Sequence, residues 1–280
     1  MPVTGNKSMH DLITDQSFEP KNISEYKLSI QVSLDGFSFF VTHKTERRLL
    51  ALKSTRVTIS SEKFLARRFA EWANSEEILS KPFSSVTICF ITPKFTLVPN
   101  ELYEKNKASS LVNLLFDAQV KSQIIANAID ELSTTLLFSI PVELKNEFDK
   151  VFNSYTLIHT GKVLAQQSLQ LIGPQETGLT LFFSPDNFSL FLHKEGTLIL
   201  TNSFTYSHPN DVLYYSLTAL KQYKIAPKQC KVLISGQIEK ESDYITLLKN
   251  YFGQTYFLLP DFESTPEPLN EPLHQFISLL

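Results

Sequence analysis

The chain contains one hairpin-like segment twice. Residues 28–41 read LSIQVSLDGFSFFV, and residues 179–192, which lie 151 positions further on, read LTLFFSPDNFSLFL. In each copy an apolar run meets an Asp-Gly or Asp-Asn dipeptide and an aromatic-rich run follows, which is a strong short-range signal for a β-hairpin. We therefore predict two hairpins whose turns contain Asp35 and Asp186.

The elements after each hairpin repeat as well. A third strand and a half-buried helix follow, and a strand, a helix and a last strand close each copy. The closing units begin with LFSI at 137–140 and LISG at 233–236, an offset of 96 positions instead of 151. The first copy therefore carries about 55 additional residues, which we place at about 80–134. The antiparallel meander and the helical crossovers predict two mixed α/β sheets.

This pattern predicts the domain organisation. We expect a loosely ordered lead-in at 1–24, a first half at 25–172 with the insert at about 80–134, a second half at 177–260 and a tail at 261–280. The tail ends in PLHQFISLL, and we expect this apolar end to dock on the rest of the chain.

Charge and composition exclude several classes of protein. Lys and Arg number 26 against 29 Asp and Glu, so we expect no nucleic-acid partner. No apolar run approaches the roughly 18 residues of a membrane span, and the first residues do not resemble a signal peptide, so we expect a cytoplasmic protein without membrane insertion. Cys89 and Cys230 lie in or beside strand-like runs and are expected to be core thiols.

The element order and the insert resemble those of the actin-like ATPase superfamily. The run PFSSVTICFITPKFTLVPNELYEKNKASSLVNLLFDAQVKSQ at 82–123 looks like the most distinctive segment of an uncharacterised bacterial family with that fold. More distantly, the chain is similar to the cytoplasmic actin-like domains of type II secretion and type IV pilus assembly proteins. The resemblance covers about residues 25–260. It implies a duplicated actin-like (ribonuclease H-like) α/β fold, with two mixed-sheet domains that face a cleft.

The resemblance also implies where a nucleotide would bind. In active members the two hairpin turns hold phosphate and metal, and a glycine turn after the fourth strand of the second half supports the adenosine. The matching candidate binding residues here are Asp35, Gly36, Asp186, Asn187, Ser235 and Gly236. We expect the turns at Asp35 and Asp186 to line one cleft between the halves. The aspartates could form a metal-facing pair, or they could serve only local hydrogen bonding in the turns.

Each of these turns departs from the family pattern. Backbone N–H groups reach phosphate oxygens most easily where glycine removes the Cβ. The usual Asp-x-Gly followed by hydroxyl residues is absent from SLDGF and SPDNF, Pro185 has no N–H, and Gly236 stands alone. The whole chain has 8 glycines. We therefore expect no catalytic residue, no metal site and no tightly held cofactor, with weak ATP and Mg²⁺ binding as the most that such turns would support.

Two classes of function fit these observations. The first is a non-enzymatic interaction or scaffold protein on a degenerate actin-like frame, whose protein partner and oligomeric state the sequence does not identify. The second is an ATP-binding or slowly hydrolysing actin-like ATPase with divergent phosphate loops. The insert at about 80–134 is the expected partner surface, because its runs bounded by Pro93 and Pro99 look like edge elements.

Overall fold

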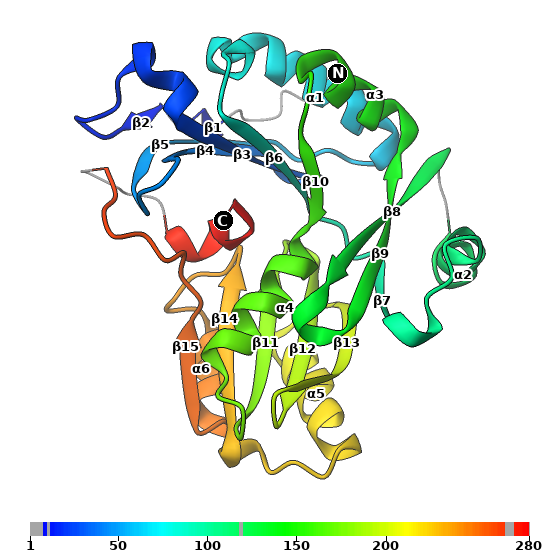
Figure 1. Ribbon diagram of the computed structural model, residues 1–280. Coiled ribbons are helices and arrows are strands. Elements are labelled where there is room, and N and C mark those ends of the chain that lie inside the picture. Colours follow the sequence, from blue (N-terminus) through cyan, green and yellow to red (C-terminus); the bar gives the residue numbers. More distant parts are fainter. Residues whose placement is uncertain (1–7, 10–11, 118–119, 267–271, 280) are drawn as a thin grey trace, which may run out of the picture.

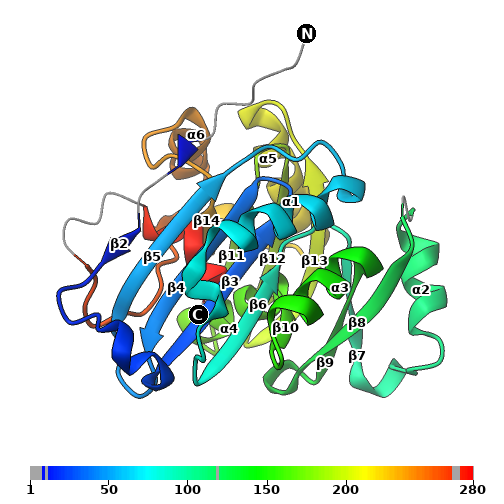
Figure 2. The same ribbon diagram turned by 90° about the horizontal axis from the view of Figure 1, so that it is seen from above.

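The computed structural model describes residues 8–9, 12–117, 120–266 and 272–279. Two large β-sheets lie one above the other, and a third, smaller sheet lies beside them (Figure 1). Helices α1 and α3 cover the outer face of the first sheet (Figure 2). No helix in the described ranges is both long enough and apolar enough to span a membrane.

The first sheet has the strand order β1-β5-β4-β3-β6-β10, and β2 also pairs with β5. The strands β3, β4 and β5 form the predicted antiparallel meander, whereas β6 and β10 run parallel to β3. The strands are β1 (Ser8–Met9), β2 (Ile13–Thr14), β3 (Tyr26–Ser33), β4 (Gly36–His43), β5 (Leu49–Arg56), β6 (Ser85–Phe90) and β10 (Thr156–His159).

The helices of this half are explained by their apolar faces. In α1 the buried residues recur at helical spacing, and the hydroxyl of Ser61 caps the helix by accepting from the N–H of Lys63. Phe69 of α1 packs against Phe37 of the sheet and against Phe148 of α3. The helices and short 3-10 turns are η1 (Pro20–Glu25), α1 (Glu62–Ser75), η2 (Glu77–Ser80) and α3 (Val142–Val151).

The second sheet repeats the arrangement with the order β13-β12-β11-β14-β15. Its first three strands are antiparallel neighbours, and β14 and β15 are parallel to β11. The predicted duplication of element order is therefore confirmed. The elements are β11 (Thr177–Phe183), β12 (Asn187–Lys194), β13 (Thr197–Thr205), α5 (Pro209–Gln222), η5 (Pro227–Gln229), β14 (Cys230–Gly236), α6 (Asp243–Tyr251) and β15 (Gln254–Phe257).

The position of the fourth strand in the first copy corrects the sequence prediction. The run LFSI lies in β9, which pairs with β7 and β8 in the small sheet, whereas β6 pairs with β3 in the main sheet. The additional elements therefore follow β6 instead of preceding the fourth strand. Both runs are short and apolar, and such runs carry no signal that tells one sheet from another. The residue boundaries proposed for the halves and the tail stay predictions.

The small sheet has the order β7-β9-β8 and is antiparallel throughout. We call the elements between β6 and α3 the inserted subdomain. It contains β7 (Phe95–Pro99), η3 (Asn100–Leu102), α2 (Ala108–Leu115), β8 (Ser122–Ile129), η4 (Asp130–Leu132) and β9 (Thr134–Pro141). Phe95 of this subdomain contacts Phe191 of the second sheet, with ring centroids 5.8 Å apart.

Three further segments connect or border the two large sheets. Helix α4 (Thr160–Leu171), which the sequence analysis did not anticipate, leads from β10 to the second sheet. Strands β1 and β2 pair with β5, so this part of the expected loose lead-in lies along the sheet edge, and residues 1–7 and 10–11 lie outside the described residues. The tail ends in η6 (Leu273–Leu279), in which Phe276 and Ile277 are buried, so the predicted docking of the apolar end is confirmed.

Candidate functional site

The first turn joins β3 to β4 and is held by its own hydrogen bonds. The N–H of Asp35 donates to the hydroxyl of Ser33 over 3.0 Å, and the carbonyl of Asp35 accepts from the N–H of Val57 over 3.0 Å. Gly36 has a φ of +132°, and a Cβ at this position would lie 2.1 Å from the carbonyl oxygen of Thr55. The neighbouring strand β5 therefore accounts for this glycine.

The second turn joins β11 to β12 and is closed in the same way. The N–H of Ser184 donates to the carbonyl of Asn187 over 2.8 Å, and Pro185 has no N–H. The side-chain amide of Asn187 donates to the carboxylate of Asp186 over 2.7 Å. The carbonyl of Asp186 accepts from the N–H of Tyr206 over 3.1 Å.

The third turn follows β14. The N–H of Gln237 donates to the carbonyl of Phe183 over 2.7 Å, and the N–H of Ile238 donates to the carbonyl of Gly236 over 2.9 Å. The carbonyl of Ile238 accepts from Nε2 of His274, 2.8 Å away in the C-terminal segment. Ser235 is fully buried, and its hydroxyl has no partner within the described part of the chain.

One cleft brings the first two turns together. Asp35 and Asp186 both line a cavity of about 510 Å³, as the sequence predicted. Asn187 also lines it, whereas Gly36 borders a neighbouring cavity of about 20 Å³ that reaches Gln237. Ser235 and Gly236 are not among the lining residues of either cavity. Whether these six residues bind a ligand stays a prediction.

Other residues of the cleft were missed by the sequence analysis. The start of α1 contributes Glu62, whose carboxylate lies 3.1 Å from the ammonium of Lys94 on the loop after β6. The N-cap Ser61 immediately before Glu62 was the available signal, because it marks the residue at which this helix begins. The remaining hydroxyl residues of the lining are Ser33, Thr58, Ser60, Thr92 and Ser184.

The electrostatics of the cleft are governed by carboxylates. Burial, together with the nearby charge of Asp186, raises the pKa of Asp35 to about 6. Burial also raises the pKa of Tyr206 to about 12, and its hydroxyl donates to the carbonyl of Ser184 over 2.8 Å. Among the described lining residues, Asp35, Asp186 and Glu62 are acidic and Lys94 is basic. The cleft therefore favours cations and neutral polar groups over unaccompanied anions.

A buried histidine ties this region to the inserted subdomain. Nε2 of His159 donates to the carbonyl of the cleft residue Thr92 over 2.9 Å, and its Nδ1 accepts from the N–H of Gly161 over 2.9 Å. The backbone N–H of His159 donates to the side chain of Asn127 in β8 over 2.9 Å. Burial lowers the pKa of His159 to about 4, so the ring is neutral at physiological pH.

Solved structures share the fold of this chain. A Bacteroides thetaiotaomicron protein described as having an actin-like ATPase fold and unknown function is 19% identical, with a TM-score of 0.77 over 86% of this chain and 93% of that one. A structure described as the PilM-PilN type IV pilus biogenesis complex contains a chain that is 13% identical, with a TM-score of 0.53 over 90% of this chain and 94% of that one. These similarities establish the actin-like ATPase fold.

Comparisons of the sequence address the family. A search of curated proteins finds no match. A family model described as "Protein of unknown function (DUF3822)" matches residues 15–254, which is most of the chain. On that match, and with the fold it shares with the Bacteroides protein, the chain belongs to the DUF3822 family.

Proposed function

We propose that this chain is a non-enzymatic interaction or scaffold protein on a degenerate actin-like ATPase frame. The observation that carries the proposal is the use of the turn N–H groups within the chain itself. Those of Asp35, Ser184 and Gln237 donate to Ser33, Asn187 and Phe183. Phosphoryl transfer depends on such donors being aimed at the phosphate oxygens. A phosphate in these turns would have to displace the hydrogen bonds that these N–H groups already make.

The glycines of the turns support the same conclusion. A Cβ at Gly236 would lie 2.2 Å from the carbonyl oxygen of Phe183, and one at Gly36 would lie 2.1 Å from that of Thr55. Each glycine is thus required by a neighbouring strand. Neither provides evidence for a bound phosphate.

The inserted subdomain is the surface that we propose for a protein partner. Leu114 and Leu115 of α2 are 82% and 49% exposed, and Leu102 of η3 is 72% exposed. Leucines exposed on one small subdomain leave apolar side chains that a protein partner would cover. The similar fold in the PilM-PilN complex belongs to a structure with a protein partner, which fits this proposal without identifying a partner here.

One observation favours the alternative function, a weak or slow ATPase. Two carboxylates on opposite sides of a ligand-sized cleft, one with a pKa of about 6, would repel each other less with a divalent cation between them. In that case Asp35 and Asp186 would hold Mg²⁺ and the hydroxyl residues would face the nucleotide. The cation would supply the charge compensation that the cleft otherwise lacks for phosphate.

Phosphate release distinguishes the two functions. We expect no Mg²⁺-dependent release above background from the purified protein, and no difference in an Asp35→Ala, Asp186→Ala double variant. Mg²⁺-dependent turnover that the double variant abolishes would overturn the proposal. Thermal unfolding with and without Mg-ATP gives a second readout, because a ligand at 100 times its Kd stabilises the folded state by about 2.7 kcal/mol.

Partner binding requires a separate experiment. We expect Leu114→Ser to leave the fold intact, because this side chain is 82% exposed, and to remove a specific protein from a native pull-down. Leu171→Ser, at a half-exposed leucine of α4, is the matched control and should retain that protein. If both variants capture the same proteins as the unmodified chain, the inserted subdomain is not the partner surface.

A further inference from the structure

The C-terminal tail crosses from the second large sheet to the first and then returns to the space between them. The N–H of Leu258 donates to the carbonyl of Ile234 in β14 over 2.7 Å. At the edge of the first sheet, the N–H of Leu49 in β5 donates to the carbonyl of Ser264 over 3.0 Å. Segment η6 lies between the two sheets, where it contacts β3, β6 and β14 (Figure 1). We call the described residues from Leu258 onward the strap.

Consecutive residues of η6 contact opposite halves of the molecule. Nε2 of His274 donates to a backbone carbonyl in the turn after β14 over 2.8 Å. The side chain of Gln275 accepts from the guanidinium of Arg56, at the end of β5, over 2.6 Å. Phe276 packs on Phe40 of β4, with ring centroids 5.5 Å apart. This short segment therefore joins parts of the chain that two different sheets position.

The strap also fills the space between the first and third turns. Gln275 and Phe276 form one wall of the cavity of about 20 Å³, and Asp35 and Gln237 line it from the two turns. A cavity of this size holds one water molecule. Gly236 of the third turn is not among the described residues that line the larger cleft. The docked strap is therefore the wall that closes the third turn against the first.

Much of the apolar packing of η6 lies outside the two main cores. Phe276 belongs to a small cluster of buried residues that is separate from both. The other members of this cluster are Phe40, Leu49 and Leu52 of the first sheet. Ile277 reaches into the core of the first half. Release of η6 would expose these few residues and leave the strands of both sheets paired, so it requires less free energy than unfolding of either half.

We propose that the strap is a latch that holds the two large sheets at their present spacing. When η6 is docked, it is bonded to both sheets and closes the third turn. When η6 is released, the sheets stay connected through α4 and through the contact of Phe95 with Phe191, so the halves move apart at the cleft and the third turn opens. The proposal does not depend on the function proposed above, because it concerns the positions of the halves and not what binds between them.

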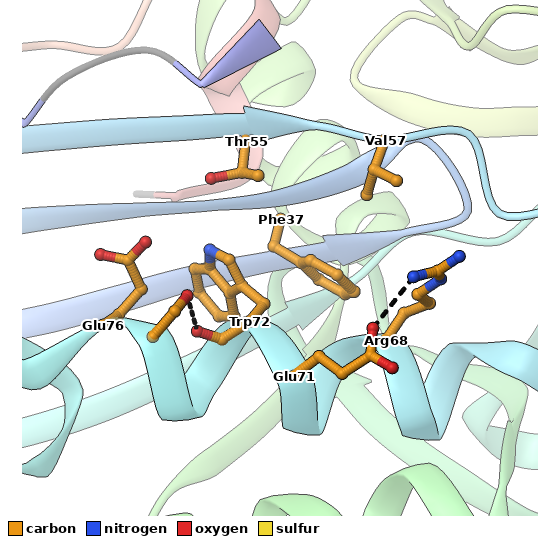
Figure 3. Close-up of a pocket in the computed structure, with 8 residues that line it drawn as sticks. Phe37, Thr55, Val57, Arg68, Glu71, Trp72 and Glu76 are labelled. Carbon is orange, nitrogen blue, oxygen red and sulfur yellow. Dashed lines mark hydrogen bonds and ion pairs between the residues drawn. The ribbon is translucent and has the colours of Figure 1, made fainter. Parts of the chain in front are cut away.

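Two helices report the positions of the two sheets. Helix α1 is fixed to the first sheet by Trp72, which stacks on Phe37 with ring centroids 5.1 Å apart (Figure 3). Helix α5 is fixed to the second sheet by Tyr215, which stacks on Phe204 with ring centroids 4.1 Å apart. A distance measured between α1 and α5 therefore follows the spacing of the sheets.

Spin labels on these helices measure that distance in the full chain. Asn74 of α1 and Thr218 of α5 are exposed, so Asn74→Cys and Thr218→Cys provide the two attachment sites. The native thiols of Cys89 and Cys230 are buried and should not react. We expect one narrow distribution of distances between the labels when the strap is intact.

The release variant is Phe276→Asp combined with Ile277→Asp, which places charges at two buried positions. We expect the distances between the labels to become longer and their distribution broader. Leu259→Asp, at a half-exposed leucine of the strap, is the control and should leave the distribution unchanged. An unchanged distribution in a folded release variant would overturn the proposal, because the strap would then cover a groove without holding the halves.

Hydrogen exchange of the unmodified chain tests the latch without the release variant, which matters if that variant does not fold. We expect the amides of 272–279 to exchange on the order of tenfold or more faster than those of the central strands β3 and β11. Such an opening leaves the strands protected and separates release from unfolding. Exchange of η6 only together with β3 and β11 would show that the segment is part of the core, and the proposal would then be wrong.

Discussion

Asp35 and Asp186 face one cleft from the turns of two corresponding hairpins, and the charge of Asp186 adds to the burial that raises the pKa of Asp35 to about 6. At neutral pH Asp35 is therefore ionised in the folded protein, and this ionisation lowers the free energy of unfolding. Ionisable groups held in unfavourable surroundings are frequent at functional sites, although structural ion pairs also perturb pKa values. This loss of stability can be measured whether or not a ligand binds in the cleft.

Replacement of Asp35 by asparagine should stabilise the protein at pH 7.5. The folded pKa lies above the unfolded value of 3.8, so folding favours the neutral carboxyl, and stability is lost as the pH rises from about 4 to 6. Asp35→Asn removes this loss. We expect a gain of about 1 to 2 kcal/mol in the free energy of unfolding, since the side chain is half-buried, and no gain at pH 4. Denaturant unfolding at both pH values measures it.

Asp211→Asn is a control for which we expect the opposite change in stability. The N–H groups of Ser207 and His208 at the start of α5 hold the pKa of Asp211 below its ordinary value. Its ionised form therefore stabilises the fold, and the asparagine variant should be less stable than the unmodified protein at pH 7.5. If both variants shift the unfolding midpoint in the same direction, the environment assigned to Asp35 is wrong.

Two buried histidines predict a loss of stability in mild acid. Burial lowers the pKa of both His159 and His193 to about 4. Between pH 6.5 and 4 the unfolded chain binds protons at these rings that the folded chain does not, so stability falls as the pH falls through this range. Over the same range the folded chain binds one proton at Asp35 that the unfolded chain does not, which raises stability. The two histidines outweigh this single proton, so the free energy of unfolding still falls. Unfolding free energies at pH 7.5, 6 and 5 should therefore decrease in that order.

His193→Leu should reduce that slope. Neither ring nitrogen of His193 has a partner among the described residues, so the substitution removes no hydrogen bond that the structure contains. We expect the variant to be at least as stable as the unmodified protein at pH 5 and to depend less on pH. An unchanged slope would mean that this ring is solvated in the folded state.

The sequence predicted the large sheets better than the small one. Turn chemistry at Asp35 and Asp186 defined the hairpins, because Asp-Gly and Asp-Asn dipeptides constrain the backbone locally. The run LFSI in β9 carried no comparable signal. Its pairing with β7 and β8 is set by contacts between distant segments, and a short apolar run fits a central strand of any sheet.

The candidate site was likewise predicted only where local chemistry defined it. The aspartates were found from their turns, and Pro185 was recognised as a missing donor. Lys94 and Glu62 were missed because their contact joins the loop after β6 to the start of α1, and the sequence analysis placed that loop in an insert outside the core. The contact of His274 with Ile238 depends on how the tail docks, which no local pattern specifies.

The docked tail predicts a large effect of Phe276→Ala. Phe276 is 2% exposed and packs against Phe40 of the first sheet, with ring centroids 5.5 Å apart. His274, two residues earlier, is hydrogen-bonded to the turn after β14. The segment thus links both sheets. Truncating a buried phenylalanine typically costs about 3 to 5 kcal/mol, and we expect a loss in this range. Leu259→Ala, at a half-exposed leucine, should cost far less in the same unfolding measurement.

Gly236 provides a test, without any ligand, of whether strand packing alone requires the glycine of the third turn. Its φ is +88°, and an added Cβ would lie 2.2 Å from the carbonyl oxygen and 2.6 Å from the nitrogen of Phe183. Gly236→Ala should therefore lose about 2 to 4 kcal/mol of stability through the packing of β14 on β11 alone. Gly196 also has a positive φ, +73°, but a Cβ added there would lie 3.6 Å from the nearest atom. Gly196→Ala therefore strains the backbone without a steric clash. Equal losses in the two variants would show that β11 does not constrain Gly236 and would remove this support for the proposed function.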